Sequence, residues 1–301
     1  MIVVDKISKR FGEIQAVDQL SLSIRPGETL GLLGPNGAGK TTTISMLVGL
    51  LKPDSGSVTL RDPEASIGGA PTDPNVRRLL GIAPQALSLY EELTARENLD
   101  FFGRLYGLTG DRLRKRRQWA LDFAGLSERS SSRVGTFSGG MKRRLNLAVA
   151  LIHEPRVVLL DEPTVGVDPQ SRNHLFDSIE RLRSEGLTIL YTTHYMEEAQ
   201  RLCDRVAIVD QGRLLALDTV EALIQQYGTR PVVKATIAKV DQSITLPGEL
   251  HGNELRFESD QPIDAISRLV VEGAQFQTVT IQQPDLEGVF LSLTGRRLRD
   301  D

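Results

Sequence analysis

The chain has 301 residues, of which 40% are hydrophobic and 25% charged, and its formal net charge is −3. This composition is typical of globular proteins, and so small a net charge gives no general affinity for nucleic acids or anionic membranes. The single cysteine, Cys203, excludes an internal disulfide and a thiolate metal cluster, and we expect it to be a buried hydrophobic residue. The N-terminal segment does not match a signal peptide. No run approaches the ~20 apolar residues that span a bilayer, so we expect any membrane-spanning part to belong to another chain.

The N-terminal part of the chain alternates apolar and polar residues over short stretches. This pattern predicts antiparallel strands at residues 1–11 and 15–34, the second stretch being turned at 25–28. The end of that stretch runs into a glycine-rich turn, and residues 40–51 then have helical periodicity. We therefore expect a strand, a loop and a helix in succession.

A loop and a helical block follow. Residues 61–78 are rich in Pro, Gly and Asp and predict a surface loop, after which 77–85 predict a strand. Residues 94–126 have helical patterns, and Thr94 and Glu97 are spaced as a capping box. The sequence therefore predicts a helical subdomain at about 90–150.

The remaining pattern divides the chain into two predicted domains. Up to about residue 220, we expect buried strands at 156–163 and 187–194. Between them lies a predicted amphipathic helix at 171–186, ended by Gly186, and after them a hairpin at 205–217. Beyond residue 220, the sequence predicts strands at 232–240, 254–259 and 276–283 and helices at 264–273 and 285–295. The prediction is thus an α/β domain over 1–220 and a small α+β domain over 221–301.

A phosphate-binding loop is the first chemical motif. Residues 34–41, GPNGAGKT, fit the pattern G-x-x-x-x-G-K-[ST] between the predicted strand and helix. Glycines let backbone N–H groups converge on phosphate oxygens, and the helix N-terminus adds positive charge. Lys40 would bind the outer phosphates, and the Thr41 hydroxyl would bind Mg²⁺. We expect nucleotide binding by Gly34, Pro35, Asn36, Gly37, Ala38, Gly39, Lys40, Thr41 and Thr42.

Two carboxylates follow a predicted buried strand. In the run VVLLDEP, Asp161 and Glu162 follow four apolar residues, and ligands of open α/β sheets bind at the carboxyl ends of strands. Asp161 suits a Mg²⁺ ligand, and Glu162 suits a group that polarises an attacking water.

A second anion site is predicted about a hundred residues after the phosphate loop. Ser138, Gly139 and Gly140 precede a helical run, so a hydroxyl and exposed N–H groups lie at a helix N-terminus. One nucleotide has one γ-phosphate, which Lys40 already binds. The second site would therefore serve a nucleotide on a second copy of the chain.

The motifs at 34–41, 138–151 and 157–163 together resemble those of the ABC (ATP-binding cassette) ATPases, over residues 1 to about 220. The resemblance implies a P-loop NTPase cassette of α/β class that hydrolyses Mg-ATP. It also implies that two cassettes pair head to tail, with each Ser138–Gly139–Gly140 segment capping the ATP on the other chain's phosphate loop. Phe137 stands where a leucine is commoner, at a position that packs.

The resemblance assigns four further residues. Phe11 matches the aromatic that stacks on adenine, although the family usually has tyrosine there. Gln85 matches the loop glutamine that contacts Mg²⁺ and water and senses the membrane partner. Asp168 matches the aspartate that crosses the dimer interface, and His194 the switch histidine that contacts the γ-phosphate. The implied catalytic set is thus Lys40, Gln85, Glu162 and His194, and the implied Mg²⁺ ligands are Thr41, Gln85 and Asp161.

A cassette alone on its chain with a C-terminal extension is similar to ATPase subunits of drug-resistance and polysaccharide exporters. That resemblance implies a homodimer held by a separate permease at the cytoplasmic face of the cell membrane. An importer motor is the nearest alternative. A soluble ABC protein acting on nucleic acids would carry two cassettes or a coiled-coil insertion, and a regulatory module that does not hydrolyse ATP is disfavoured by Glu162 and His194.

For the basic run at 111–118 we expect a solvated helix face, with contact to the permease or lipids as the alternative, and no nucleic-acid binding.

Overall fold

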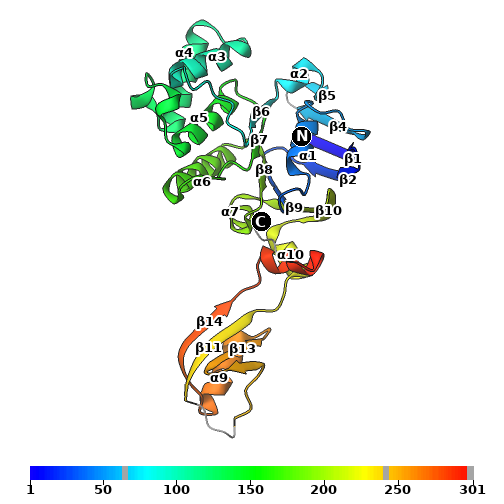
Figure 1. The fold of residues 1–301 in the computed structure, drawn as a ribbon, viewed down its shortest axis with the longest axis vertical. Coiled ribbons are helices and arrows are strands. Elements are labelled where there is room, and N and C mark those ends of the chain that lie inside the picture. Colours follow the sequence, from blue (N-terminus) through cyan, green and yellow to red (C-terminus); the bar gives the residue numbers. More distant parts are fainter. Residues whose placement is uncertain (63–66, 240–243, 297–301) are drawn as a thin grey trace. The chain divides into compact units, whose positions relative to one another are not determined.

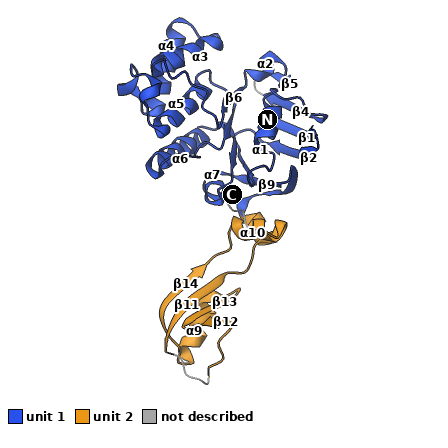
Figure 2. Cartoon of the chain, viewed as in Figure 1, with its two compact units in different colours: residues 1–220, 299–301 blue, residues 221–298 orange. Residues whose placement is uncertain are grey.

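The structure is a computed structural model that describes residues 1–62, 67–239 and 244–296. The chain divides into two compact units, Met1–Val220 and Glu221–Leu298 (Figure 2). Among the described residues, no helix is both long and apolar enough to cross a membrane.

The first unit contains a four-stranded antiparallel sheet (Figure 1). Its strands, in spatial order, are β2 (Ile14–Ile24), β1 (Ile2–Phe11), β4 (Ser55–Asp62) and β5 (Ile67–Gly69). Alternation along β1 and β2 places Ile2, Val4 and Ile24 in the core. The register shift between Val4 and Ile7 brings Ile7 into the same core.

The second sheet of this unit has six strands and is mainly parallel. Its spatial order is β10 (Arg213–Asp218), β9 (Arg205–Asp210), β3 (Thr29–Leu33), β8 (Thr188–Thr193), β7 (Val157–Asp161) and β6 (Leu80–Ala83). Every residue of β3, β7 and β8 is buried, as expected of central parallel strands covered on both faces. The carboxyl ends of these three strands therefore meet at one edge of the sheet.

Helices surround this sheet. Helix α1 (Lys40–Leu47) follows β3, and Ile44, Met46 and Leu47 pack into a core shared by the two sheets. Helices α6 (Pro169–Ser184) and α7 (Met196–Leu202) follow β7 and β8. Gly186 lies just beyond α6 with φ +83°, as predicted for a helix end.

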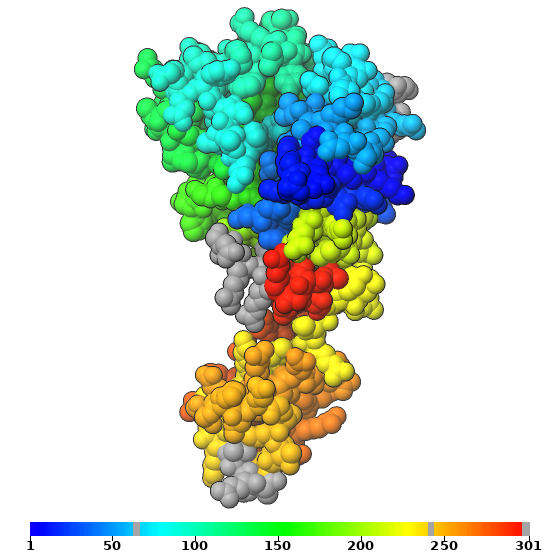
Figure 3. Space-filling view, turned by 45° about the vertical axis from the view of Figure 1, so that its right-hand side comes forward, coloured from blue at the N-terminus to red at the C-terminus, as the bar shows by residue number. Residues whose placement is uncertain are grey.

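The helical subdomain lies between β6 and β7 along the chain and has its own core. It comprises α3 (Ala95–Leu105), α4 (Gly110–Ala124), the 3₁₀ turns η1 (Ser127–Arg129) and η2 (Val134–Thr136), and α5 (Gly139–Leu151). The capping box predicted at the start of α3 is confirmed, with the Glu97 N–H donating to Thr94 Oγ1 at 3.2 Å. In Figure 3, the blue-green to green surface of this block is visible on the same face as the blue surface of the N-terminal strands.

The second unit is a small α+β fold. Its antiparallel sheet has the spatial order β12 (Glu249–His251), β13 (Glu254–Glu258), β11 (Val232–Lys239) and β14 (Gln275–Gln282). Leu269 of α9 (Pro262–Val271) packs against Val233 and Phe257 on one face of this sheet. Helices α8 (Val220–Tyr227) and α10 (Leu286–Thr294) precede and follow the sheet along the chain.

Two sequence predictions are wrong in part. Strand β3 does not pair with β2 across the turn at 25–28 but lies parallel to β8 and β9, because its mainly apolar residues need cover on both faces. The predicted loop at 61–78 contains β5, which pairs with β4, and a short helix α2 (Pro74–Arg77). Asp73 caps that helix and Pro74 opens it, a pattern that favours a helix start over a loop. Residues 63–66 of the predicted loop lie outside the described residues.

Two further predictions concern side chains. Cys203 is buried, as expected. The basic run at 111–118 is a helix face whose arginines are paired within the chain, with ion pairs Arg112–Glu154, Arg114–Asp111, Arg116–Glu154 and Arg117–Asp100 at 3.0, 3.0, 3.6 and 2.8 Å. These pairs reduce the charge available to an outside partner.

Candidate active site

The phosphate loop connects the end of β3 to the start of α1. A Cβ atom on Gly34 would lie 2.2 Å from the Val209 carbonyl oxygen, and one on Gly39 would lie 2.3 Å from that of Ala16. Gly39 also has φ +93°, which disfavours any side chain. Glycine is therefore required at both positions, and the loop backbone turns into the N-terminus of α1, where N–H groups favour phosphate.

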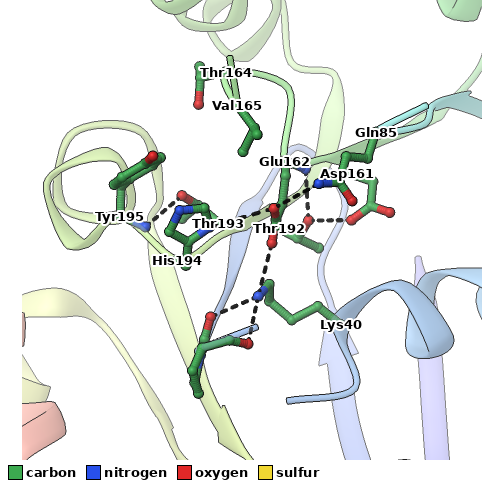
Figure 4. Close-up of polar contacts among 12 residues, drawn as sticks. Lys40, Gln85, Asp161, Glu162, Thr164, Val165, Thr192, Thr193, His194 and Tyr195 are labelled. Carbon is green, nitrogen blue, oxygen red and sulfur yellow. Dashed lines mark hydrogen bonds and ion pairs between the residues drawn. The ribbon is translucent and has the colours of Figure 1, made fainter. Parts of the chain in front are cut away.

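Lys40 is buried at the first position of α1, with 4% of its surface exposed. Its Nζ donates to the carbonyl oxygens of Gly34 and Pro35 at 2.8 and 2.9 Å. The same atom forms an ion pair with Glu162 Oε1 at 3.0 Å (Figure 4). The ammonium group is thus fixed at the loop by two carbonyls and one carboxylate, and it does not move freely in solvent.

Glu162 follows directly after β7 and is buried in a left-handed backbone conformation, with φ +45°. Such a conformation is strained for a residue with a side chain and is concentrated at functional sites. The Glu162 N–H donates to Thr192 Oγ1 at 3.0 Å, which holds the turn against β8. This geometry directs the carboxylate toward Lys40 at the carboxyl edge of the sheet.

Two more predicted residues meet the Glu162 carboxylate. Gln85 Nε2 donates to Glu162 Oε2 at 3.3 Å, and His194 Nδ1 lies 3.5 Å from the same oxygen (Figure 4). His194 is 8% exposed. The structure therefore brings Lys40, Gln85, Glu162 and His194 together from four separate segments of the chain.

Asp161 lies beside this cluster at the end of β7. Burial raises the pKa of Asp161, while hydrogen bonds from the Thr192 and Thr41 hydroxyls act in the opposite direction. Thr192 Oγ1 donates to Asp161 Oδ1 at 2.8 Å. The Thr41 hydroxyl and the Asp161 carboxylate thus lie together, and oxygen donors of this kind fit Mg²⁺.

The described residues contain no group of three or more His, Cys, Asp or Glu side chains that could hold a metal ion. Mg²⁺ is commonly bound by one or two carboxylates together with substrate phosphates. The Thr41–Asp161 pair beside the phosphate loop therefore fits Mg²⁺ bound with a nucleotide better than an all-protein metal site.

A cavity of about 350 Å³ opens over the phosphate loop. It is lined by Ile14, Gln15, Ala16, Asn36, Gly37, Gly39, Lys40, Thr41, Thr42, Gln85 and Glu162. Residues 14–16 belong to β2 and were missed by the sequence analysis, which had no motif for them. The sequence signal that could have indicated them is their nearness to Phe11, because Ile14 pairs with Phe11 across the turn between β1 and β2.

Phe11 ends β1 and is 49% exposed, so it is not a core residue. It pairs across the turn with Ile14, which lines the cavity. Lys9 Nζ lies 5.8 Å from the centroid of its ring. An exposed aromatic face next to the cavity is compatible with stacking on a base.

The Ser138–Gly139–Gly140 segment lies elsewhere, at the N-terminus of α5. Ser138 caps this helix, accepting from the Met141 N–H at 3.2 Å, and both Ser138 and Gly139 are exposed. A Cβ atom on Gly140 would lie 2.0 Å from Ser171 Oγ and 3.5 Å from Asp168 Oδ2. The start of α5 therefore packs against the start of α6.

Asp168 is exposed and caps α6, accepting from the Ser171 N–H at 2.9 Å. This hydrogen bond lowers the pKa of Asp168. The structure thus groups Asp168 with the Ser138 segment, and neither is among the described residues that line the cavity over Lys40.

Arg143 of α5 was not singled out from the sequence. Its Nη1 donates to the Gln85 carbonyl oxygen at 2.5 Å, and its Nη2 donates to that of Val165 at 3.2 Å. Arg143 therefore ties α5 to the loops that carry Gln85 and Glu162.

Comparison with known proteins identifies this arrangement. A family model described as "ABC transporter" matches residues 17–165. The chain is 40% identical to the linearmycin resistance ATP-binding protein LnrL of Bacillus subtilis, over 100% of both chains. It is also 40% identical to the Nod factor export ATP-binding protein I of Burkholderia lata, over 98% of this chain and 97% of that protein.

Solved structures give the same result for the cassette. An ATP-binding subunit of an ABC transporter has 30% identity and a TM-score of 0.67, covering 75% of this chain and 93% of that one. A dimeric post-hydrolysis state of the cassette MJ0796, bound to ADP and Pi, has 26% identity and a TM-score of 0.64, covering 73% and 98%. The chain belongs to the ABC transporter ATP-binding family. It is an ATP-binding subunit of a transporter and an ATPase.

Proposed function

We propose that this chain is the motor of an exporter, that it works as a head-to-tail pair with a second copy, and that it drives a separate membrane permease. Relatives named for linearmycin resistance and Nod factor export match it over nearly their whole length, including the second unit. In this proposal Met1–Val220 is the nucleotide-binding domain, with its helical subdomain at about 90–150, and Glu221–Leu298 is an accessory domain.

Hydrolysis takes place, in this proposal, at the cluster around Glu162. The phosphate-loop N–H groups and Lys40 bind the outer phosphates of ATP, and Phe11 stacks on the adenine. Glu162 polarises a water molecule for in-line attack on the γ-phosphorus, and His194 contacts the γ-phosphate. Gln85 helps to orient that water. Thr41, Asp161 and Gln85 would hold Mg²⁺, which would supply positive charge to the phosphate oxygens.

The observation that carries the pairing is the separation of two phosphate-binding features. Lys40 and Glu162 face the cavity, whereas the exposed start of α5 carries Ser138 and Gly139 and is not among the cavity-lining residues. In a two-fold pair, each exposed segment reaches the cavity of the other copy. The dimeric MJ0796 cassette supports this arrangement as an analogy.

The permease is proposed to bind near Gln85. An aromatic cluster follows this residue, with Tyr90 and Phe101 ring centroids 4.9 Å apart and 49% and 41% of these residues exposed. Leu105 extends this surface and is 69% exposed. Contiguous exposed apolar surface marks interaction sites, so the chain would be held peripherally at the cytoplasmic face of the membrane by its permease.

Affinity purification tests the transporter assignment. A tagged Glu162→Gln chain is used as bait in native membranes with and without Mg-ATP, and bound proteins are identified by mass spectrometry. We expect a polytopic permease and no substrate-binding protein. Recovery of a permease together with a binding protein would favour an importer, and ribosomal or DNA-associated partners without a membrane protein would contradict transport.

A further inference from the structure

A buried carboxylate outside the proposed site connects the segments that carry Glu162 and His194. Glu198 of α7 is 1% exposed. Its Oε1 accepts from Thr164 Oγ1 at 2.6 Å and from Arg172 Nε at 3.0 Å. Its Oε2 accepts from Tyr191 and Thr193 hydroxyls at 2.9 and 2.6 Å. A buried charge with this many donors is stabilised, and the donors are held in one geometry.

The donors come from segments on both sides of the candidate site. Thr164 lies two residues after Glu162, in the turn that leaves β7. Thr193 precedes His194 and is the last residue of β8. Glu198 therefore links the turn that aims Glu162 to the strand end that aims His194.

The hydrogen bonds continue past His194. Thr193 Oγ1, which donates to Glu198, accepts from the Tyr195 N–H at 2.9 Å (Figure 4). The Tyr195 ring lies 4.0 Å from that of His194 and 4.9 Å from the Arg172 guanidinium carbon, measured to centroids. The Glu198 carboxylate thus holds Thr193 directly, and Thr193 Oγ1 in turn holds the Tyr195 backbone. These two residues flank His194 in the chain.

We propose that Glu198 is a positioning residue for hydrolysis, which fixes the His194 loop relative to Glu162 without touching nucleotide. The inference rests on the proposed roles of Glu162 and His194. A carboxylate is needed because all four partners can donate at once to its two oxygens. Glutamine keeps the shape but offers one oxygen and an NH₂ group, so one pair of donors must turn away or lose its partner.

A matched control is Glu28, another buried carboxylate of the same unit. It is 7% exposed, accepts from the Arg25 N–H at 2.6 Å and pairs with Arg205 at 3.1 Å. It precedes β3 and so lies at the amino edge of the sheet, whereas the site lies at the carboxyl edge. Glu28→Gln therefore tests loss of a buried charge without disturbance of the site.

The test measures kcat, the Kd for Mg-ATP and thermal stability of the full chain as wild type, Glu198→Gln and Glu28→Gln. We expect Glu198→Gln to lower kcat by about tenfold to a hundredfold, the scale of a misplaced catalytic group, while the Kd changes by less than about twofold. Glu28→Gln should lose stability and keep kcat. Thr193→Val removes one of the four donors to Glu198, together with the acceptor of the Tyr195 N–H. It should lower kcat in the same direction, which decides the question if Glu198→Gln does not fold.

Two results would overturn the inference. One is a kcat within about twofold of wild type in folded Glu198→Gln and Thr193→Val chains. The other is an equal loss of kcat in Glu28→Gln, since that would make the effect one of stability. A wild-type chain that binds Mg-ATP without hydrolysing it would instead contradict the proposed function itself.

Discussion

Glu162→Gln is expected to remove nearly all ATP hydrolysis and to leave ATP binding intact. The substitution keeps the shape of a side chain that is 6% exposed but removes the negative charge that faces Lys40 at 3.0 Å. Loss of the group that polarises the attacking water should lower kcat by about 10²–10⁴-fold. The phosphate loop and Lys40 are unchanged, so the Kd for Mg-ATP should be similar or lower. Steady-state ATPase assays and equilibrium binding on the purified chain check both parts.

The control for this variant is Glu185→Gln, the same chemical change at a half-exposed carboxylate paired with Arg181 at 3.0 Å. It should leave kcat unchanged, because exposed ion pairs contribute little. If Glu162→Gln retained more than about a tenth of wild-type kcat, Glu162 would not be the group that polarises the water.

Lys40→Ala is expected to weaken ATP binding as well as to stop hydrolysis. The ammonium group is fixed at the phosphate loop by the carbonyls of Gly34 and Pro35, and it forms an ion pair with Glu162. Its loss removes charge stabilisation of the outer phosphates, which should cost about 10²–10³-fold in kcat/KM. It also leaves the buried Glu162 carboxylate without its ion-pair partner, which should destabilise the fold.

The matched control is Lys115→Ala, which removes the same charge from an exposed position on α4. Nucleotide binding measured by equilibrium dialysis, together with thermal unfolding, separates the two effects of Lys40→Ala. A Lys40→Ala chain with wild-type affinity for Mg-ATP would contradict the proposed role of this lysine.

The parts of the fold that local pattern determines were predicted well. The capping box at Thr94 and Glu97, the glycine end of α6 and the buried strand before Asp161 each depend on neighbouring residues, and each is present. The partner of β3 could not be predicted locally, because pairing with β8 depends on a strand more than 150 residues away. The helix at Pro74–Arg77 was not predicted, because the Pro- and Gly-rich composition around it favours loops.

The candidate site was predictable as a set of motifs but not as a geometry. The spacing of 34–41 and the order of the later motifs indicated Lys40, Glu162 and His194. The structure places Lys40 and His194 beside the Glu162 carboxylate. Nothing in the spacing indicated the left-handed backbone conformation of Glu162, whose N–H donates to Thr192 Oγ1 of the neighbouring strand. Glu198 and Arg143 were missed because their roles come from partners distant in sequence.

The second unit matches its predicted strands and helices, with helix α8 and the short strand β12 added. Its pattern of alternating residues in β11 and β13 determined one buried face, which α9 covers. No catalytic motif was predicted there, and the proposed chemistry uses only residues of the first unit.

The most direct measurement is the ATPase rate of mixed variants. Ser138→Arg and Lys40→Ala chains are assayed alone and after mixing in equal amounts. In a head-to-tail pair, both lesions of a mixed dimer fall on one site and the other site is intact, so activity should return to roughly a quarter of wild type if chains pair at random and sites act independently. Each variant alone should be nearly inactive. No recovery on mixing, with dimer exchange verified by differential tagging, would contradict action of Ser138 on the nucleotide of a second copy.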